Sequence, residues 1–326
     1  MKEHKSTPLP NGRLHPRFAG LLSFLRVPRL QDLLAENSPA DWAIYGAPFD
    51  GGTTYRPGAR FGPRAIRDAS QYVKAYHLEL AVDWAKSMSV VDAGDAPTAP
   101  FSCEANAQML TEYARTIGGV STKLLAVGGD HSIALANMRV AFERAGRPQG
   151  GLAVLHFDAH LDTVDRVWGE AYSHASPFRR AIEEGIIAPS KMLSIGTRGP
   201  LTMAEDLAWC KAQGIEVVSS QDAINSIVGL EAVARFVTRE AQRPVYLSID
   251  IDVLDPAFAP GTGTPVPGGL TTARLFEHLR AAKGMHCVGA DVVEVLPDRD
   301  TAGITALAAA HCLAEILALD ACVRNA

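Results

Sequence analysis

The sequence predicts an α/β protein whose mainly parallel sheet is covered by helices on both faces. Short β-rich runs recur along the chain, and most are followed by a loop and then a helical pattern. The apolar residues of these runs are continuous rather than alternating, as expected for strands buried on both faces. The 326 residues, 47% of them hydrophobic, suffice for one large core, and no segment resembles a linker between two halves.

The regular elements begin after a polar, proline-interrupted start. We therefore expect an N-terminal arm over residues 1–40, able to pack on a neighbouring subunit through its apolar patch at 18–25, and a single domain over residues 41–326. About eight strands are expected, at residues 42–47, 89–92, 123–127, 152–157, 192–196, 215–218, 245–251 and 287–292. Helices are expected at residues 133–144, 177–184, 203–212, 230–241, 272–282 and 304–321.

Composition excludes several classes of protein. A net charge of -5 without a basic cluster argues against nucleic-acid binding and favours small molecules and copies of the same chain as partners. No apolar run approaches the roughly 20 residues of a membrane span, and the first residues lack the apolar core of a signal peptide. An odd number of cysteines without CxxC spacing favours a reducing compartment, so we expect a cytoplasmic protein; the five are Cys103, Cys210, Cys287, Cys312 and Cys322.

Two carboxylates are expected at the carboxyl end of a buried strand. In Ser248-Ile-Asp-Ile-Asp-Val-Leu-Asp-Pro, Asp250 and Asp252 are two residues apart and point to one side, roughly 6.5 to 7 Å apart along the strand. Leaving both charged and unpaired there would cost several kcal/mol. A divalent cation that neutralises both is the simplest solution.

Other strand ends add further ligand types. His131 follows one strand, and Asp158, His160 and Asp162 follow another, although a straight strand would place the outer pair about 13 Å apart. The chain must therefore leave the strand near Asp158 and curl. His156 is expected to support these ligands or to pack in the core.

Two imidazoles and four carboxylates exceed the needs of one ion. A pair of bridged divalent ions, roughly 3.5 to 4 Å apart, is the natural interpretation. Oxygen and imidazole ligands without thiolate favour Mn²⁺, leave Co²⁺ and Ni²⁺ open, and argue against a structural zinc site. The four negative charges of the carboxylates balance the charge of two such ions. Because the ions lower the pKa of the water between them, a bridging hydroxide would be available as a nucleophile at neutral pH. This chemistry indicates hydrolysis.

Three motifs in this order resemble the ureohydrolase family of arginase, agmatinase and guanidinobutyrase, and in particular its agmatinase-like branch. The motifs are Gly128-Gly-Asp-His-Ser, His156-Phe-Asp-Ala-His-Leu-Asp-Thr and the Ser248–Pro256 stretch, and the resemblance runs from about Trp42 to the end of the chain. It implies a three-layer α/β/α fold, two Mn²⁺ ions per subunit and a trimeric or hexameric homo-oligomer.

The resemblance also implies a role for each site residue. One metal would be held by His131, Asp158, Asp162 and Asp250, and the other by Asp158, His160, Asp250 and Asp252. His174, in Tyr172-Ser-His-Ala-Ser-Pro-Phe, corresponds to the histidine implied to pass a proton to the leaving amine. Glu294, in Asp291-Val-Val-Glu-Val, corresponds to the glutamate implied to pair with the guanidinium.

The implied reaction is hydrolysis of a small guanidino compound to urea and an amine. Residues 163–170 include two valines and a tryptophan, which disfavours arginine as the substrate. Val266 replaces an acidic residue of agmatinase-like relatives, Arg166 or Arg299 can meet a carboxylate, and Trp168 can face an apolar or cationic tail. A guanidino acid such as 4-guanidinobutyrate is therefore preferred, with agmatine next.

Two alternatives stay open. The departures from the family's motifs also fit an unusual small guanidine or biguanide as substrate, with nickel in the site. From a different class, the chain would be a non-catalytic partner subunit of a hetero-oligomeric ureohydrolase, although the intact set of six ligands argues against this. A binuclear phosphatase or deacylase is disfavoured because Asp291-Val-Val-Glu294 suits a guanidinium better than an anionic phosphate.

Overall fold

The computed structural model describes residues 6–33, 40–225 and 227–325. Its centre is an eight-stranded sheet in the order β4-β1-β5-β10-β9-β6-β7-β8, and all neighbouring strands in it run parallel. The sheet predicted from the sequence is thereby confirmed. In chain order its strands are β1 (Trp42–Gly46), β4 (Val90–Asp95), β5 (Lys123–Val127), β6 (Leu152–Phe157), β7 (Ile187–Thr197), β8 (Glu216–Ser219), β9 (Val245–Asp250) and β10 (Cys287–Val293).

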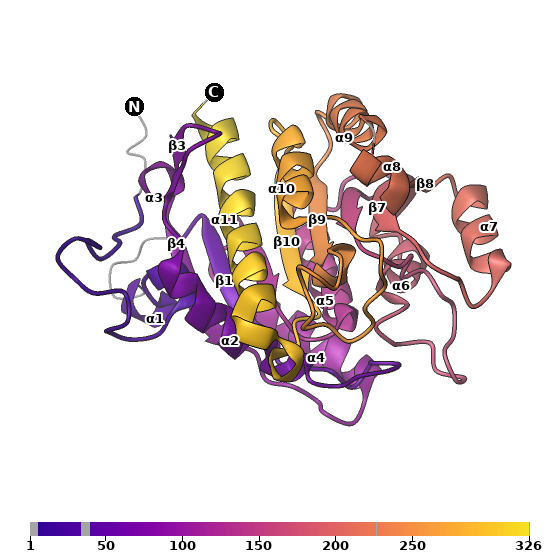
Figure 1. The fold of residues 1–326 in the computed structure, drawn as a ribbon, viewed down its shortest axis with the longest axis horizontal. Coiled ribbons are helices and arrows are strands. Elements are labelled where there is room, and N and C mark those ends of the chain that lie inside the picture. Colours follow the sequence, from indigo (N-terminus) through magenta and orange to yellow (C-terminus); the bar gives the residue numbers. More distant parts are fainter. Residues whose placement is uncertain (1–5, 34–39, 226, 326) are drawn as a thin grey trace.

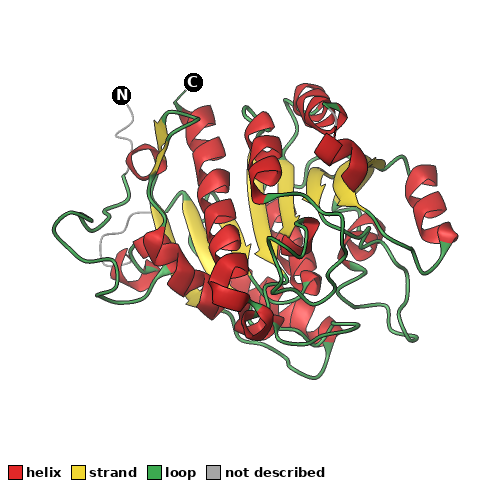
Figure 2. Cartoon of the chain, in the orientation of Figure 1, coloured by secondary structure: helices red, strands yellow, loops and turns green. Residues whose placement is uncertain are grey.

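Helices pack on both faces of the sheet and complete the three layers (Figures 1 and 2). One face carries α4 (Cys103–Thr116), α5 (Ala134–Arg144) and α6 (Pro177–Glu183). The other carries α2 (Gly62–Ala69), α8 (Ser220–Asn225), α9 (Val228–Arg239), α10 (Thr272–Ala281) and α11 (Ile304–Arg324). The remaining helices are α1 (Leu30–Leu33), α3 (Trp84–Ser87) and α7 (Ala204–Ala212), the last beside β8. All six helices expected from the sequence form.

The register of the central strands places their carboxyl ends at one level. Ile249 of β9 lies opposite both Phe157 of β6 and Val292 of β10, and Val292 lies opposite Val127 of β5. All residues of β6 and β9 are buried, and the candidate carboxylate ligands stand at or just after the carboxyl ends of these strands. The loops that follow the four neighbouring strands β5, β10, β9 and β6 therefore begin at the same edge of the sheet.

The described part of the N-terminal arm packs on its own chain. The backbone N–H of Thr7 donates to the carbonyl of Ala85 at 2.7 Å, and Phe24, Leu25 and Val27 are buried in the main core. Residues 34–39, which belong to the arm expected over residues 1–40, lie outside the described residues, and contact between the arm and a neighbouring subunit stays a prediction. Phe18 is 94% exposed, so the described residues leave part of the apolar patch uncovered.

Several elements were not predicted from the sequence. They include α2, α4 and a hairpin of β2 (Tyr76–His77) and β3 (Val82–Asp83). In α4 the buried positions are alanine, asparagine and threonine as well as leucine, so its apolar stripe is weak. The residues of α2 include glycine and proline, which disfavour a helix in sequence-based reasoning although proline is accepted in the first turn.

The longest helix corrects one expectation. Within the described residues, the stretch Thr301–Arg324 is long and apolar enough to cross a membrane, with a mean hydropathy of 1.8, so the view that no apolar run approaches a span was wrong. In this fold, however, 72% of its apolar window is buried, and α11 packs between α2 and α10 against β10. A core helix surrounded by protein is apolar all round for this reason.

Candidate active site

The candidate ligands converge at the carboxyl ends of the four central strands. His131 opens a short 3₁₀ helix, η5 (His131–Ile133), after β5, while Asp158 directly follows β6 and Asp250 ends β9. A sharp turn after β5 depends on Gly129, whose φ is +80° and where a Cβ would lie 2.3 Å from the carbonyl oxygen of Ala47. The chain also leaves β6 at Phe157, as the spacing of its ligands requires.

A first group of ligand atoms surrounds the Nδ1 atom of His131. It lies 2.8 Å from Asp162 Oδ2, 3.2 Å from Asp158 Oδ2 and 3.5 Å from Asp250 Oδ2. Asp162 reaches this point because its backbone adopts a left-handed conformation, with φ of +50°. Atoms that coordinate one ion at 2.0–2.2 Å lie about 3 Å apart, which is the spacing found here.

A second group forms around His160. The Nδ1 atom of His160 lies 3.0 Å from Asp252 Oδ2 and 3.3 Å from Asp158 Oδ1. Asp158 thus has one carboxylate oxygen in each group, the arrangement of a bridging ligand. Asp250 joins the first group through Oδ2, and its Oδ1 accepts the backbone N–H of Asp252 at 2.8 Å.

Hydrogen bonds among neighbouring residues determine which ring nitrogen of His131 carries the proton. Asp291 accepts the hydroxyl protons of Tyr246 at 2.6 Å and Ser248 at 2.7 Å. Ser248 has then spent its only proton, so its oxygen must accept from Nε2–H of His131, 2.8 Å away. The buried Nδ1 atom, which has no hydrogen-bond partner among the described residues, therefore directs a lone pair toward three carboxylates. A cation between them fits this donor set.

Charge in the site also calls for a cation. Burial, followed by the nearby carboxylates of Asp252 and Asp158, raises the pKa of Asp250 well above its usual range. Burial and the charge of Asp158 likewise raise the pKa of Asp252. Burial also opposes ionisation of Asp158, but its close contacts with the imidazoles of His131, His156 and His160 outweigh burial and hold its pKa well below the usual range. Divalent ions would relieve the repulsion among these carboxylates.

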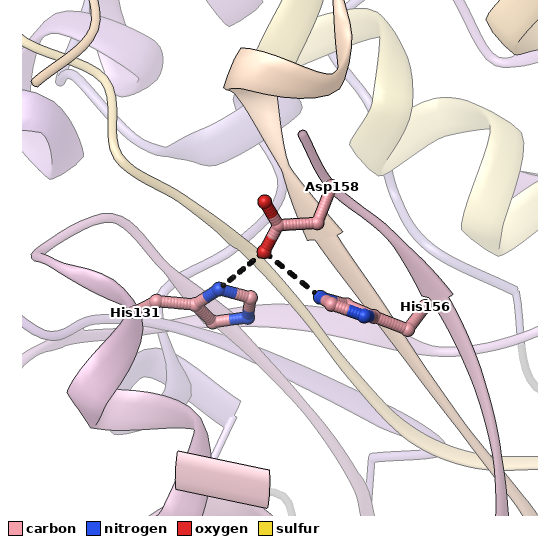
Figure 3. Close-up of side chains that lie close together, drawn as sticks. All are labelled: His131, His156 and Asp158. Atoms are coloured by element: carbon pink, nitrogen blue, oxygen red, sulfur yellow. Dashed lines mark hydrogen bonds and ion pairs between the residues drawn. The ribbon is translucent and has the colours of Figure 1, made fainter. Parts of the chain in front are cut away.

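His156 lies behind Asp158 in the core. Figure 3 shows His131 and His156 converging on one oxygen of Asp158, with Nε2 of His156 at 2.9 Å. The Nδ1 atom of His156 lies 3.1 Å from the hydroxyl of Ser194. These three residues, His131, His156 and Asp158, form one group that could hold an ion, and Asp158, His160 and Asp252 form another. With both nitrogens engaged, His156 is placed to orient Asp158.

His174 and Glu294 meet beside the first ligand group. Nδ1 of His174 lies 2.9 Å from Glu294 Oε1, which also accepts the backbone N–H of His131 at 2.9 Å. The other oxygen, Oε2, is buried without a hydrogen-bond partner in the described part of the chain. Burial lowers the pKa of His174, but the Glu294 carboxylate outweighs it and raises the value to about 9.

A cavity of about 520 Å³ opens onto these groups. His160, Asp162, Asp250 and His174 line its polar end. Apolar and mixed walls come from the loop after β6 and from the segment before α7, including Val164, Val167, Trp168, Leu201 and Met203. Its size and its polar end suit a small elongated molecule with one polar head.

The four residues singled out for substrate binding separate into two pairs. Trp168 and Arg166 line the cavity, with Trp168 81% exposed and Arg166 donating to the carbonyl of Gly169 at 2.9 Å. Val266 is not among the lining residues, and its carbonyl oxygen accepts hydrogen bonds from Arg198. Arg299 is exposed, pairs with Asp298 at 3.5 Å and also lies outside the lining.

Sequence reasoning missed other lining residues. Thr54, from the loop after β1, and Thr264 lie at the cavity wall, and Asp206 of α7 contributes a carboxylate. The segment before α7 carries no motif, so only the fold brings it to this site. For Thr54, the glycine-rich loop around it was the available signal.

The chain is similar to known proteins over most of its length. Residues 40–319 match the sequence model of the Arginase family. The chain is 40% identical over 310 residues to guanidinopropionase of Pseudomonas aeruginosa, covering 93% of each protein. It is 39% identical over 309 residues to guanidinobutyrase of the same organism, covering 94% of each. The solved structure of proclavaminate amidinohydrolase from Streptomyces clavuligerus matches with a TM-score of 0.84 and 37% identity, covering 95% of this chain and 100% of that one.

Proposed function

Because the chain belongs to the arginase family, we propose that it hydrolyses a small guanidino acid to urea and an amine. Like its homologues it is a hydrolase of C–N bonds in guanidino compounds. The observation that carries the proposal is the pair of ligand groups that share Asp158, beside a buried glutamate with one oxygen that has no hydrogen-bond partner among the described residues.

Arginase-family proteins are binuclear-metal enzymes, and we assign the two positions to the groups around His131 and His160. The preferred ion is Mn²⁺, because all six candidate ligands are oxygen or imidazole. Bound there, the two ions supply a nucleophile at neutral pH by lowering the pKa of water. Asp158 would bridge them, and His156 and Ser248 would orient their ligands.

Two residues of the chain would bind the substrate and supply a proton. Glu294 would hold the planar guanidinium through Oε2, which forms no hydrogen bond within the described part of the chain, while Oε1 stays bonded to His174 and to the backbone of His131. Glu294 contacts His174, which lines the polar end of the cavity, so a guanidinium held by Glu294 would lie close to the lining residues of both ligand groups. His174 would provide the proton that the leaving amine requires.

Arg166 supports a guanidino acid as the substrate. Its guanidinium stays charged in the cavity lining, and the tail of a guanidino acid ends in a carboxylate. The names of two relatives, guanidinopropionase and guanidinobutyrase, point to substrates of this kind. The apolar wall formed by Val164, Val167 and Leu201 suits the methylene chain between the two charged ends.

Agmatine is a second candidate because of Asp206. This carboxylate lines the same cavity and would meet an amine at the end of the tail. The two candidates can be separated by urea release from 3-guanidinopropionate, 4-guanidinobutyrate, agmatine, arginine and a biguanide, with Mn²⁺ or Ni²⁺ loaded.

A matched pair of variants sharpens the test. If the guanidino acid is the substrate, Arg166→Gln lowers kcat/KM for it by about tenfold, whereas Asp206→Asn leaves it unchanged or raises it. Agmatine as the true substrate would give the opposite pattern. Absence of urea from every compound would refute the assignment and favour the partner-subunit alternative.

A further inference from the structure

His174 has no free ring nitrogen in this structure. Its Nδ1 atom lies 2.9 Å from Glu294 Oε1, and its Nε2 atom lies 3.1 Å from the backbone nitrogen and 2.7 Å from the hydroxyl oxygen of Thr54. A backbone N–H can only donate, so Nε2 of a neutral imidazole must accept it. The proton of neutral His174 therefore resides on Nδ1 and is donated to Glu294.

The hydroxyl of Thr54 has a different role in each protonation state. When Nε2 also carries a proton, the backbone N–H of Thr54 has no acceptor there, whereas Oγ1 can accept. The same hydroxyl carries its own proton, and Thr54 lines the cavity together with His174. The nitrogen that would release a proton from His174 thus faces this hydroxyl.

We propose that the hydroxyl of Thr54 relays the proton from His174 to the leaving amine. In this step the Nε2–H bond of the imidazolium breaks as Oγ1 of Thr54 takes that proton. The proton already on Oγ1 moves to the amine nitrogen as its bond to the guanidinium carbon breaks. Thr54 ends neutral, and His174 ends neutral with its proton on Nδ1. The relay rests on the proposed hydrolysis of a guanidino group.

The loop that carries Thr54 is held firmly enough for such a role. The carbonyl of Gly52 accepts the backbone N–H of His174 at 3.0 Å, and the N–H of Gly52 donates to Asp130 Oδ2 at 2.7 Å. Further along, the N–H of Gly58 donates to Asp50 at 2.7 Å. Thr54 and His174 are therefore fixed to each other through backbone as well as side-chain contacts, which limits the loss of geometry in a side-chain variant.

An isosteric pair of threonine variants tests the relay. Thr54→Val removes the hydroxyl but keeps the branched shape and the backbone N–H. Thr53→Val is the matched control, because the Thr53 hydroxyl lies in the same loop, is buried and has no hydrogen-bond partner in the described residues. We expect Thr54→Val to lower kcat for urea release by about 100-fold with KM and bound metal unchanged, since general acid catalysis contributes about 10²–10⁴. Thr54→Ser should restore most of the rate, and Thr53→Val should stay within about twofold of the parent.

Titration of His174 gives a readout that does not depend on turnover. Glu294, Asp162 and Asp130 carry the charges that act on this imidazole. Oγ1 accepts a charge-assisted bond from the protonated ring, which is stronger than the bond it donates to the neutral ring. NMR of ¹⁵N-labelled histidine should therefore show a lower pKa for His174 in Thr54→Val and recovery in Thr54→Ser. Urea release by Thr54→Val at the parental kcat would overturn the relay alone. Absence of urea from the parent with the whole substrate panel would overturn the proposed function as well.

Discussion

At the scale of a single residue, Glu294 contacts two other candidate site residues, His174 and His131. Its φ of +66° is a left-handed conformation that is uncommon for glutamate, and its N–H donates to the carbonyl of Gly129 at 2.9 Å. This geometry directs Oε1 to His174 and His131, and Oε2 has no hydrogen-bond partner among the described residues. The left-handed backbone thus places the Glu294 carboxylate beside His174 and the start of η5.

Replacing Glu294 by glutamine keeps its shape and removes its charge. We expect Glu294→Gln to lower kcat/KM by about 100-fold, because a charge-assisted pair with a buried guanidinium contributes about 3 kcal/mol. Urea release from the preferred guanidino compound measures the effect, and metal analysis should show unchanged binding. Glu143→Gln, which affects an ion pair with Arg115 away from the site, serves as the control. Parental kcat/KM in Glu294→Gln would contradict the assigned role.

The sequence pointed to candidate site residues more readily than to the residues that contact and orient them. Asp250 and Asp252 stand out because two carboxylates at the end of an apolar strand need a partner, and that argument is local. The contact of Ser248 with Asp291 depends on the pairing of β9 with β10, which no local pattern reveals. Arg299 looked suitable for a carboxylate in sequence, but its side chain pairs with Asp298 at the surface.

At the scale of the elements, the side chain of one arginine, Arg198, holds the segment after β9 in place through hydrogen bonds to several of its carbonyl oxygens. The guanidinium of Arg198 donates to the carbonyls of Asp252 at 2.7 Å, Leu254 at 3.1 Å and Val266 at 2.7 Å. It thereby ties the 3₁₀ turn η6 (Ile251–Val253), which carries Asp252, to the loop that contains Val266. Only the planar, five-donor head of arginine can serve so many carbonyls at once.

We expect Arg198→Lys to destabilise this segment by about 2 kcal/mol, because several buried carbonyls lose their donors. The thermal midpoint should fall, and metal analysis should show loss of the ion held by Asp252 and His160 first. Arg243→Lys is a matched control, since Arg243 donates to the carbonyls of Gln149 and Gly151 far from the site. Equal metal loss in both variants would argue against a specific role for Arg198.

The long helix α11 is anchored by Asp320. This buried carboxylate accepts from Trp42 Nε1 at 2.9 Å and pairs with Lys123 at 2.6 Å and Arg324 at 2.8 Å. Burial opposes its ionisation, but Lys123 and then Arg324 outweigh burial and lower its pKa. The anchor thus joins the last helix to β1 and β5.

Asp320→Asn should destabilise the fold by about 2 kcal/mol at pH 7, because three donors lose a charged acceptor. Since the folded pKa of Asp320 is below the unfolded one, its contribution is complete above the unfolded pKa and is lost as pH falls through the folded pKa. Urea unfolding at pH 7 and near pH 3 should therefore show a smaller difference from the parent at the lower pH. Glu231→Gln, in an exposed pair with Arg235, should change stability by less than about 0.5 kcal/mol. A difference independent of pH would contradict this account.

For the whole molecule, the sequence predicted layers and a functional edge but not the strand order. Continuous apolar runs separated by helices are a local signal, so the parallel sheet and the edge that carries the ligands follow from them. The order β5-β10-β9-β6 at the centre depends on crossovers that local patterns do not encode. It is this order that brings His131 and Asp158, from two strands separated by two others, to one point.

The clustered carboxylates link metal binding to the stability of the entire fold. Asp158, Asp250 and Asp252 are at most 3% exposed and repel one another unless cations or protons neutralise them. A ligand that binds only the folded state stabilises it by about 4 kcal/mol at 1,000 times its Kd, which for a chain of this length raises the Tm by about 6 °C. Because protons compete with the metal for these groups, the increase should grow from pH 6 to pH 8.

This coupling is tested by differential scanning calorimetry of the full chain, stripped with a chelator and then titrated with Mn²⁺, Ni²⁺ or Zn²⁺. We expect the parent to gain thermal stability with Mn²⁺, and Asp158→Asn to lose most of that gain because both ligand groups share this residue. Asp298→Asn, whose side chain pairs with Arg299 at the surface, should respond like the parent. A parent whose Tm is indifferent to chelation and to all three ions would show that the six side chains gather for another reason. Equal increases in Tm for the parent and for Asp158→Asn would instead show that metal binds without Asp158, and would contradict its assignment as the bridging ligand.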